Sequence, residues 1–261
     1  MRRDFSTGYL LVLLVLLLGV GVRPPGVRQV ADLTAPAPSP FRVGERGQFR
    51  ASWGVLGRVG TGTLGIVELD TIRNRPAYHA VFTIRGGIPG ARVDERLETW
   101  LDQRRLYSLR FAQRTRYPRF SRDRTREFLA DERRWTGRTN TREESGRLPT
   151  NLPLDEIGFI YHTRTMDLQV GREYTIHRYW NPEGNPVRLR VLRRETVKVP
   201  AGTYQTIVVQ PIIRTSGLFA EDGEARVYFS EGPAREVVQL RAKLSIGTLR
   251  LQLEKYDPGA R

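Results

Sequence analysis

Alternation of apolar and polar residues recurs along most of this chain, and it is the pattern of β-strands with one buried face. In residues 48–53, 78–84 and 93–101 every second position is mostly apolar. Turns rich in glycine, proline or asparagine separate such stretches. Further strands are expected at 59–69, 109–117, 122–128, 133–139, 174–180, 187–199, 204–214, 227–230, 236–244 and 248–256.

The middle of the chain breaks this pattern. Residues 140–152 are polar and predict a loop. Residues 153–166 predict a helix, with Asn151 as N-cap and Pro153 in the first turn. Its apolar residues recur at helical spacing: Leu154, Ile157, Ile160 and Tyr161. About a dozen strands and one short helix predict a mainly β fold, either a large curved antiparallel sheet or a partly open barrel.

An apolar run from Tyr9 to Val22 follows Arg2 and Arg3. Its 14 residues are fewer than the roughly 20 of a transmembrane helix, and it resembles the apolar part of a secretory signal. Residues 1–22 are therefore predicted to be a signal sequence or a retained N-terminal anchor, using the Sec or the twin-arginine route. Such a chain is exported to the periplasm or cell envelope, where residues 9–22 could hold it at the inner membrane.

Five prolines in residues 23–40 predict an extended linker. We expect a single β-rich domain over 41–256, followed by a tail at 257–261. The chain contains no cysteine, which excludes disulfides, lipid attachment through a thiol, and thiolate chemistry.

The formal net charge is +15, and 40 of the 43 basic residues are arginine. Residues 104–142 hold thirteen arginines against four acidic residues. Export argues against nucleic acid as a partner despite this charge, so anionic lipid or acidic polysaccharide is the expected partner class. An envelope protein is the alternative, and the oligomeric state is left open.

Five segments of the chain resemble a bacterial domain-of-unknown-function family, number 3108. They are IYHTRT at 160–165, VGREY at 170–174, ETVKVPAGTY at 195–204, RVYFS at 226–230 and AKLSIG at 242–247. The resemblance extends over about 41–256 and is strongest from 152 onward. It implies an exported envelope protein with a curved, mostly antiparallel sheet, and it supplies no catalytic residues.

Residue types that carry chemistry are sparse. His79, His162 and His177 lie too far apart in sequence for a metal motif, so no metal or cofactor is predicted and the histidines are interpreted as structural or surface groups. Asp94 and Glu98 share a strand face about 13 Å apart, wider than a glycosidase pair, with Arg96 between them. An ion-pair row explains these three residues better than acid–base catalysis does.

Aromatic residues on the strands are candidates for lining a ligand cavity if the sheet curls. They are Trp53, Tyr78, Phe82, Trp100, Phe111, Trp135 and Trp180. Ordinary core packing is the alternative explanation for them.

Six arginines of one predicted hairpin are candidates for anion binding: Arg110, Arg114, Arg116, Arg122, Arg124 and Arg126. If paired positions sum to an odd number, such as 239, the first three face away from the last three, and acidic residues partly neutralise them. If the sum is even, all six share one face, which costs stability unless an anion binds there. We favour the odd register, which corresponds to a solvated charged hairpin.

These features favour a non-enzymatic exported domain that binds an amphipathic or acidic envelope component. A scaffold that recruits another envelope protein through a sheet edge is the second hypothesis. A hydrolase is the third, and it needs a nucleophile–base or carboxylate pair that the linear sequence does not display.

Overall fold

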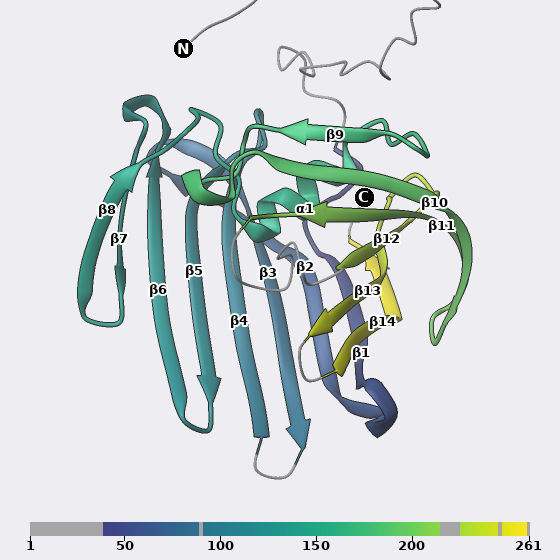
Figure 1. The fold of residues 1–261 in the computed structure, drawn as a ribbon. Helices are drawn as coiled ribbons and strands as arrows, with labels where there is room; N and C mark the ends of the chain where they lie inside the picture. Colours follow the sequence, from purple (N-terminus) through teal and green to yellow (C-terminus); the bar gives the residue numbers. More distant parts are fainter. Residues whose placement is uncertain (1–38, 89–90, 215–224, 245–246, 260–261) are drawn as a thin grey trace, which may run out of the picture. The chain divides into compact units, whose positions relative to one another are not determined.

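Fourteen antiparallel strands form one sheet in the computed structural model, which describes residues 39–88, 91–214, 225–244 and 247–259 (Figure 1). The strands are β1 (Glu45–Trp53), β2 (Arg58–Ile72), β3 (Arg75–Ile88), β4 (Ala91–Asp102), β5 (Ser108–Tyr117), β6 (Phe120–Leu129), β7 (Arg134–Thr139), β8 (Arg142–Arg147), β9 (Glu173–Ile176), β10 (Val187–Val199), β11 (Gly202–Ile212), β12 (Arg226–Ser230), β13 (Val237–Leu244) and β14 (Gly247–Pro258). The predicted mainly β, antiparallel fold is confirmed.

The order of the strands leaves the sheet open. It runs β8-β7-β6-β5-β4-β3-β2-β1-β14-β13-β12-β11-β10-β9, so the chain pairs its last long strand with its first. β8 and β9 are the two edges, and they do not pair with each other. Six of the thirteen strand pairs contain a register shift. Such bulges bend strands and increase their twist, which explains how so wide a sheet curls (Figure 1).

The alternation seen in the sequence decides which side of the sheet is buried. In β1, Gly47, Phe49 and Ala51 are buried while Arg46 and Gln48 are exposed. The inward side chains of both halves of the sheet meet in one large apolar cluster that includes residues of α1 (Glu156–Arg164). α1 is the one α-helix among the described residues, and it packs against β3 and β4.

The helix begins later than the sequence predicts. Asp155, and not Asn151, is the N-cap, and its Oδ1 accepts hydrogen bonds from the amides of Ile157 and Gly158 at 3.0 and 2.8 Å. Leu154 is excluded from the helix because it forms a β-bridge with Tyr179. A residue held in an extended ladder cannot also supply the first helical turn, so the expected start at Pro153 was wrong.

Two buried contacts fix α1 to the sheet. At its start, Asp155 Oδ2 accepts a 2.5 Å hydrogen bond from Thr99 of β4, and the Asp155 amide donates to Ser108 Oγ of β5. At its end, the Arg164 guanidinium donates to both carboxylate oxygens of Glu45 in β1, at 2.6 and 2.7 Å. The side chains of this second pair are only 1% and 4% exposed.

The predicted loop at 140–152 contains β8 and therefore was wrong in part. Only Asn140 and Thr141 separate β7 from β8, and Asn140 has a positive φ of 52° that suits so tight a turn. Apolar–polar alternation does not identify β8, because an edge strand leaves one side unpaired and tolerates charged residues on both faces.

The described residues belong to one compact unit. The predicted signal or anchor, 1–22, and most of the predicted linker lie outside them. Phe41, where the domain was expected to begin, is buried. β14 continues to Pro258, which pairs with Glu45, so part of the predicted tail belongs to the sheet. Within the described part of the chain, no helix is both long enough and apolar enough to cross a membrane.

We expect Arg164→Met to destabilise the protein by about 3 kcal/mol or more, because removing one partner leaves the Glu45 carboxylate buried and uncompensated. Arg190→Met is the matched control, since Arg190 pairs with Glu173 at 2.6 Å on the surface. Its cost should stay below about 1 kcal/mol. Urea unfolding followed by tryptophan fluorescence measures both, and equal losses in the two variants would contradict the anchoring role of Arg164.

Candidate functional site

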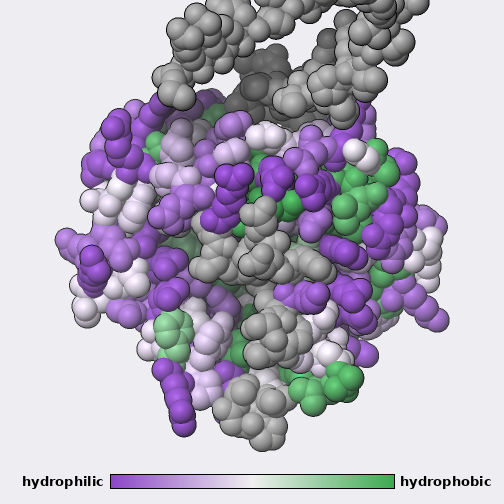
Figure 2. Space-filling model, viewed as in Figure 1, coloured by the Kyte–Doolittle hydropathy of each residue, from purple (hydrophilic) through white to green (hydrophobic). Residues whose placement is uncertain are grey.

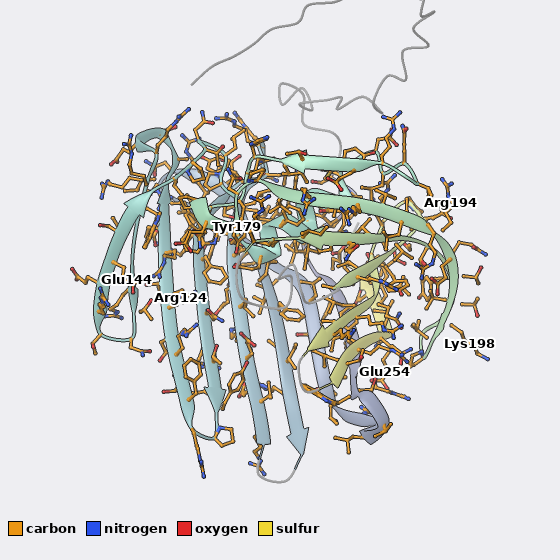
Figure 3. All side chains as sticks on the ribbon, viewed as in Figure 1. Arg124, Glu144, Tyr179, Arg194, Lys198 and Glu254 are labelled. Carbon is orange, nitrogen blue, oxygen red and sulfur yellow. The ribbon has the colours of Figure 1, made fainter. Side chains whose placement is uncertain are left out.

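A cavity of about 660 Å³ lies on the concave side of the sheet, between the inner faces of β3–β8 and the helix α1. Its polar lining residues are Glu95, Gln113, Tyr117, Arg122, Arg124, Arg126, Glu144, Glu156, Tyr179, Asn181 and Glu183. Its remaining lining residues are Phe82, Leu97, Phe111, Trp135, Ile157, Ile160, Trp180, Pro182, Ile213 and Leu240. In Figure 3, Arg124 and Glu144 lie on the teal strands at the left, and Tyr179 lies near α1.

Strand register decides which arginines reach the cavity. β5 and β6 pair so that Gln113 lies opposite Arg124 and Phe111 opposite Arg126. Paired positions therefore sum to 237. The odd register is confirmed, two residues from the example of 239. Because directly paired residues share a face, Arg122, Arg124 and Arg126 all point inward.

Arg110, Arg114 and Arg116 lie on the opposite, outer face of the same hairpin. There Arg110 pairs with Glu127, and Arg116 lies 2.7 Å from Asp123. These three predicted anion-binding residues are therefore not part of the cavity. The structure divides the six candidates into an inner set and an outer set.

Arg126 is the most enclosed of the inner arginines. Its guanidinium lies 2.5 Å from Glu144 of β8, 4.6 Å from the centroid of the Trp135 ring and 5.9 Å from that of Trp180. Burial lowers the pKa of Arg126, and the charge of Arg124 lowers it further. Arg126 thus joins β6, β8 and the two indole rings into one wall.

Arg122 and Arg124 have no carboxylate within 4.0 Å among the described residues. The Arg122 guanidinium lies over the Phe120 ring at 4.8 Å. The Nε atom of Arg124 is buried without a hydrogen-bond partner, as are the Nε atom of Arg126 and the Nε1 atom of Trp180. Nine buried polar side-chain atoms of the described residues lack a partner, and several belong to residues outside the cavity, so these three atoms do not by themselves mark a ligand site.

The cavity also carries carboxylates, so it is not uniformly basic. Glu95 accepts hydrogen bonds from Gln113 at 2.9 Å and from the Tyr117 hydroxyl at 3.1 Å. Burial and the Glu95 charge raise the pKa of Tyr117 to about 12, which keeps this hydroxyl protonated as a donor. Glu156 accepts from the Tyr179 hydroxyl at 2.8 Å, while its second oxygen is buried without a partner.

The aromatic candidates divide in the same way as the arginines. Phe82, Phe111 and Trp180 line the cavity together with Trp135. Trp53 and Tyr78 pack against the core instead. The prediction for Trp100 was wrong, because inward positions of β4 are odd-numbered, and its ring stacks on His79 outside, with centroids 4.3 Å apart.

Sequence reasoning missed several lining residues. Glu144 was assigned to a loop, and Glu156 and Tyr179 were not considered as site residues. Tyr117 ends the same strand as the candidate Phe111 with the same parity, so alternation alone could have identified it. Glu156 and Tyr179 come from segments whose position depends on the tertiary fold, and no local pattern indicates it.

The outer face holds the predicted ion-pair row in altered form. Arg96 donates to both oxygens of Glu98 at 2.8 Å, as expected, whereas Asp94 lies 3.4 Å from Arg85 of β3. His79 also contacts Glu98 at 2.9 Å, and this hydrogen bond is the main reason that the pKa of Glu98 is lowered to about 2. Glu98 is thus held as a structural anion.

The other two histidines lie in different surroundings. Burial and the nearby Arg178 charge lower the pKa of His162 to about 3, while His177 is exposed. In the described part of the chain, no three histidine, aspartate or glutamate side chains are grouped as metal ligands.

Family comparison agrees with the motifs. The family described as "Protein of unknown function (DUF3108)" matches residues 48–254. The chain belongs to this family. No curated protein matches the sequence.

Solved structures add the fold alone. The chain is similar to a β-barrel-like protein of domain-of-unknown-function family 1849 from Brucella abortus, with 11% identity, a TM-score of 0.51, and coverage of 82% of this chain and 96% of that one. It also matches a proposed exported protein with a YmcC-like fold from Bacteroides fragilis, with 11% identity, a TM-score of 0.30, and coverage of 84% and 97%. A third match is a proposed lipoprotein from Parabacteroides distasonis, with 11% identity, a TM-score of 0.30, and coverage of 84% of this chain and 98% of that one.

The stability of the folded protein should depend on pH through Asp155, the N-cap of the helix that bounds the cavity. Burial, with a smaller contribution from the Glu156 charge, raises the pKa of Asp155 to about 7, against about 4 in an unfolded chain. The folded state therefore binds more protons between these values, and the stability contributed by Asp155 is lost as pH rises from about 4 to about 7. Asp155→Asn keeps a capping oxygen and should remove this decline.

Urea midpoints of both proteins across this pH range measure the effect. Asp123→Asn is the control, because the hydrogen bond from Arg116 lowers the pKa of Asp123 and gives its contribution the opposite sign. Parallel curves for wild type and Asp155→Asn would show that Asp155 does not titrate there.

Proposed function

We propose that this protein is an exported, non-enzymatic domain that binds an amphipathic anion of the cell envelope, with a lipid as the favoured ligand. One observation carries the proposal. Two arginines without carboxylate partners, Arg122 and Arg124, face the same cavity as a set of aromatic and aliphatic side chains. The cavity volume of about 660 Å³ falls within the roughly 300–1,000 Å³ of small-molecule sites.

Each part of such a ligand has a counterpart in the lining. A phosphate or carboxylate would accept hydrogen bonds from Arg122 and Arg124, and bonds between ionised groups are the strong ones. The apolar part would lie along Phe82, Leu97 and Phe111. Glu156, which also lines the cavity, would accept from a headgroup hydroxyl or ammonium, so the headgroup would combine an anion with a donor.

Export rests on the sequence. The apolar run 9–22 behind two arginines and the proline-rich segment after it support an envelope location for this domain. A chain that works beside a membrane encounters anionic amphiphiles continually, whereas nucleic acid is absent from that compartment.

The carboxylates of the cavity support binding better than hydrolysis. Glu144 is paired with Arg126, Glu95 accepts from three neutral donors, and Glu156 accepts from Tyr179. Each of these three is already engaged as an acceptor, which orients it for recognition. Glu183, the fourth lining carboxylate, is exposed and has no such partner among the described residues, so the lining offers it no second free carboxyl for acid–base work.

A scaffold role remains the second proposal, because β8 and β9 are open edges. β9 has four residues, and β8 carries Arg142, Glu143, Glu144 and Arg147. Short, charged edges are those that natural sheets use to discourage strand addition. Ligand binding is therefore the better-supported function.

Decyl phosphate should bind the full-length protein more tightly than the uncharged decyl maltoside, and Arg124→Gln should weaken decyl phosphate binding about tenfold. The matched control is Arg114→Gln, which removes an exposed arginine from the outer face of the same hairpin and should leave affinity unchanged. Isothermal titration calorimetry measures all four combinations.

Equal affinity of Arg124→Gln and Arg114→Gln would refute the cavity as the anion site. Equal affinity of the two decyl compounds for the wild type would refute anion recognition altogether.

A further inference from the structure

Hairpin topology places two turns at the same end of the sheet. Consecutive antiparallel strands turn at alternating ends, so the β1–β2 and β5–β6 turns lie at one end, separated by β3 and β4, and the β2–β3 and β4–β5 turns lie at the other end (Figure 1). The pairings Ala51–Gly60, Gly60–Gly86 and Gly86–Val93 run across the sheet next to this end, and Asp94–Arg116 and Arg116–Ser121 extend the row. We call segments 54–58 and 117–122 the hairpin tips.

The hairpin tips expose large apolar side chains to solvent, although the Tyr117 and Phe120 rings also contact each other, with centroids 6.0 Å apart. Val55 is 103% exposed and Leu56 57%, while Tyr117 and Phe120 are 39% and 43% exposed. Four of the seven exposed large apolar side chains of the described residues thus lie on two short turns at one end. In Figure 2 a green hydrophobic area stands out at the lower right, where the β1–β2 turn lies. Exposed apolar groups collected in this way mark interaction sites.

Arginines surround these tips in excess over acids. Three have carboxylate neighbours, namely Arg58 with Glu254 at 3.6 Å, Arg85 with Asp94 at 3.4 Å and Arg116 with Asp123 at 2.7 Å. Four more have no carboxylate within 4.0 Å in the described ranges: Arg92, Arg114, Arg119 and Arg122. The net charge of this end is therefore positive.

Apolar side chains at turn apices within a ring of arginines match one kind of surface. A bilayer offers an apolar interior for Val55, Leu56 and Phe120, and anionic headgroups at the depth of the guanidinium groups. A protein partner would instead need a shaped apolar patch, whereas these tips are separate protrusions.

We propose that the hairpin tips dock the domain on the surface of an anionic phospholipid bilayer. Tyr117 and Arg122 belong to a tip and also line the cavity, so docking brings the cavity to the membrane. This inference does not rest on the proposed function, because a domain can dock on a membrane whatever its cavity holds.

A cysteine-free chain allows a position-specific test in the full-length protein. Val55→Cys is labelled with a nitrobenzoxadiazole dye, whose emission rises in apolar surroundings, and is titrated with vesicles of phosphatidylcholine alone or mixed with phosphatidylglycerol. Val67→Cys and Val170→Cys are matched controls, because these valines are also exposed, at 52% and 42%, but lie away from the tips. Because the readout is local, binding through the N-terminal apolar run cannot imitate it.

Emission at position 55 should rise at least about twofold with the anionic vesicles, and emission at 67 and 170 should not change. Leu56→Ser with Phe120→Ser should weaken the vesicle dependence at position 55 about tenfold, because two apolar groups no longer leave water. The control is Leu69→Ser with Val170→Ser, which removes two exposed apolar groups outside the hairpin tips. It should leave the vesicle dependence of the emission at position 55 unchanged.

No rise at position 55, or an equal rise at all three positions, would overturn docking through the tips. A rise at 55 that occurs without vesicles as protein concentration increases would also overturn it, by showing that the tips join two copies of the chain. Arg124→Gln should leave the signal at 55 intact, so failure of docking and failure of ligand binding are distinguishable.

Discussion

A buried ion pair joins the helix to the sheet, because the Arg164 guanidinium and the Glu45 carboxylate compensate each other's charge at the centre of the sheet. Tyr256 of β14 donates to the same carboxylate at 3.0 Å, and the Arg164 group also donates to the Ala234 carbonyl. The end of α1 is thereby joined to β1 and β14, the strands that connect the two halves of the sheet. Because the edges do not pair with each other, the helix and this contact maintain the curvature that a closed barrel would obtain from its ladder.

The cavity exists because α1 fills only part of the concave side. Asp155 holds the start of the helix against β4 and β5, and Ile157 and Ile160 form one wall of the remaining space. On the facing wall Arg126 can stay charged because Glu144 neutralises it and two indole rings cover it. Arg122 and Arg124 lack such a carboxylate, so the charge they add to the lining is available to a ligand.

Much of this could be predicted from local pattern. Apolar–polar alternation identified most strands and the antiparallel class, because every second residue of a half-buried strand faces the core. Helical spacing of apolar residues indicated the helix. The same rule places Trp100 on the outer face, since Leu97 and Leu101 of the same strand are odd-numbered and face inward. The register of the arginine hairpin followed from charge, because like charges directly opposite each other are unfavourable.

The remaining features depend on contacts between distant segments. β8 shows no apolar–polar alternation, since it is an edge strand. Its Glu144 can be recognised as a lining residue only once the fold brings it beside Arg126. Likewise, Asn151 and Asp155 are equally good caps in isolation. The Leu154–Tyr179 bridge decides between them, and Thr99 and Ser108, which bond to Asp155, come from strands 47 or more residues away.

The unpaired edges of the sheet also bear on the size of molecule that the cavity could hold. In a closed barrel, strand number and shear set the internal diameter, so a longer occupant must be bent or rejected. Here β8 is an edge with no ladder bond to β9, so no closed ladder fixes the width of the space inside the curved sheet. In the proposed binding role, recognition would therefore rest on the headgroup at the arginines, and strand number would set no upper limit on the length of the ligand.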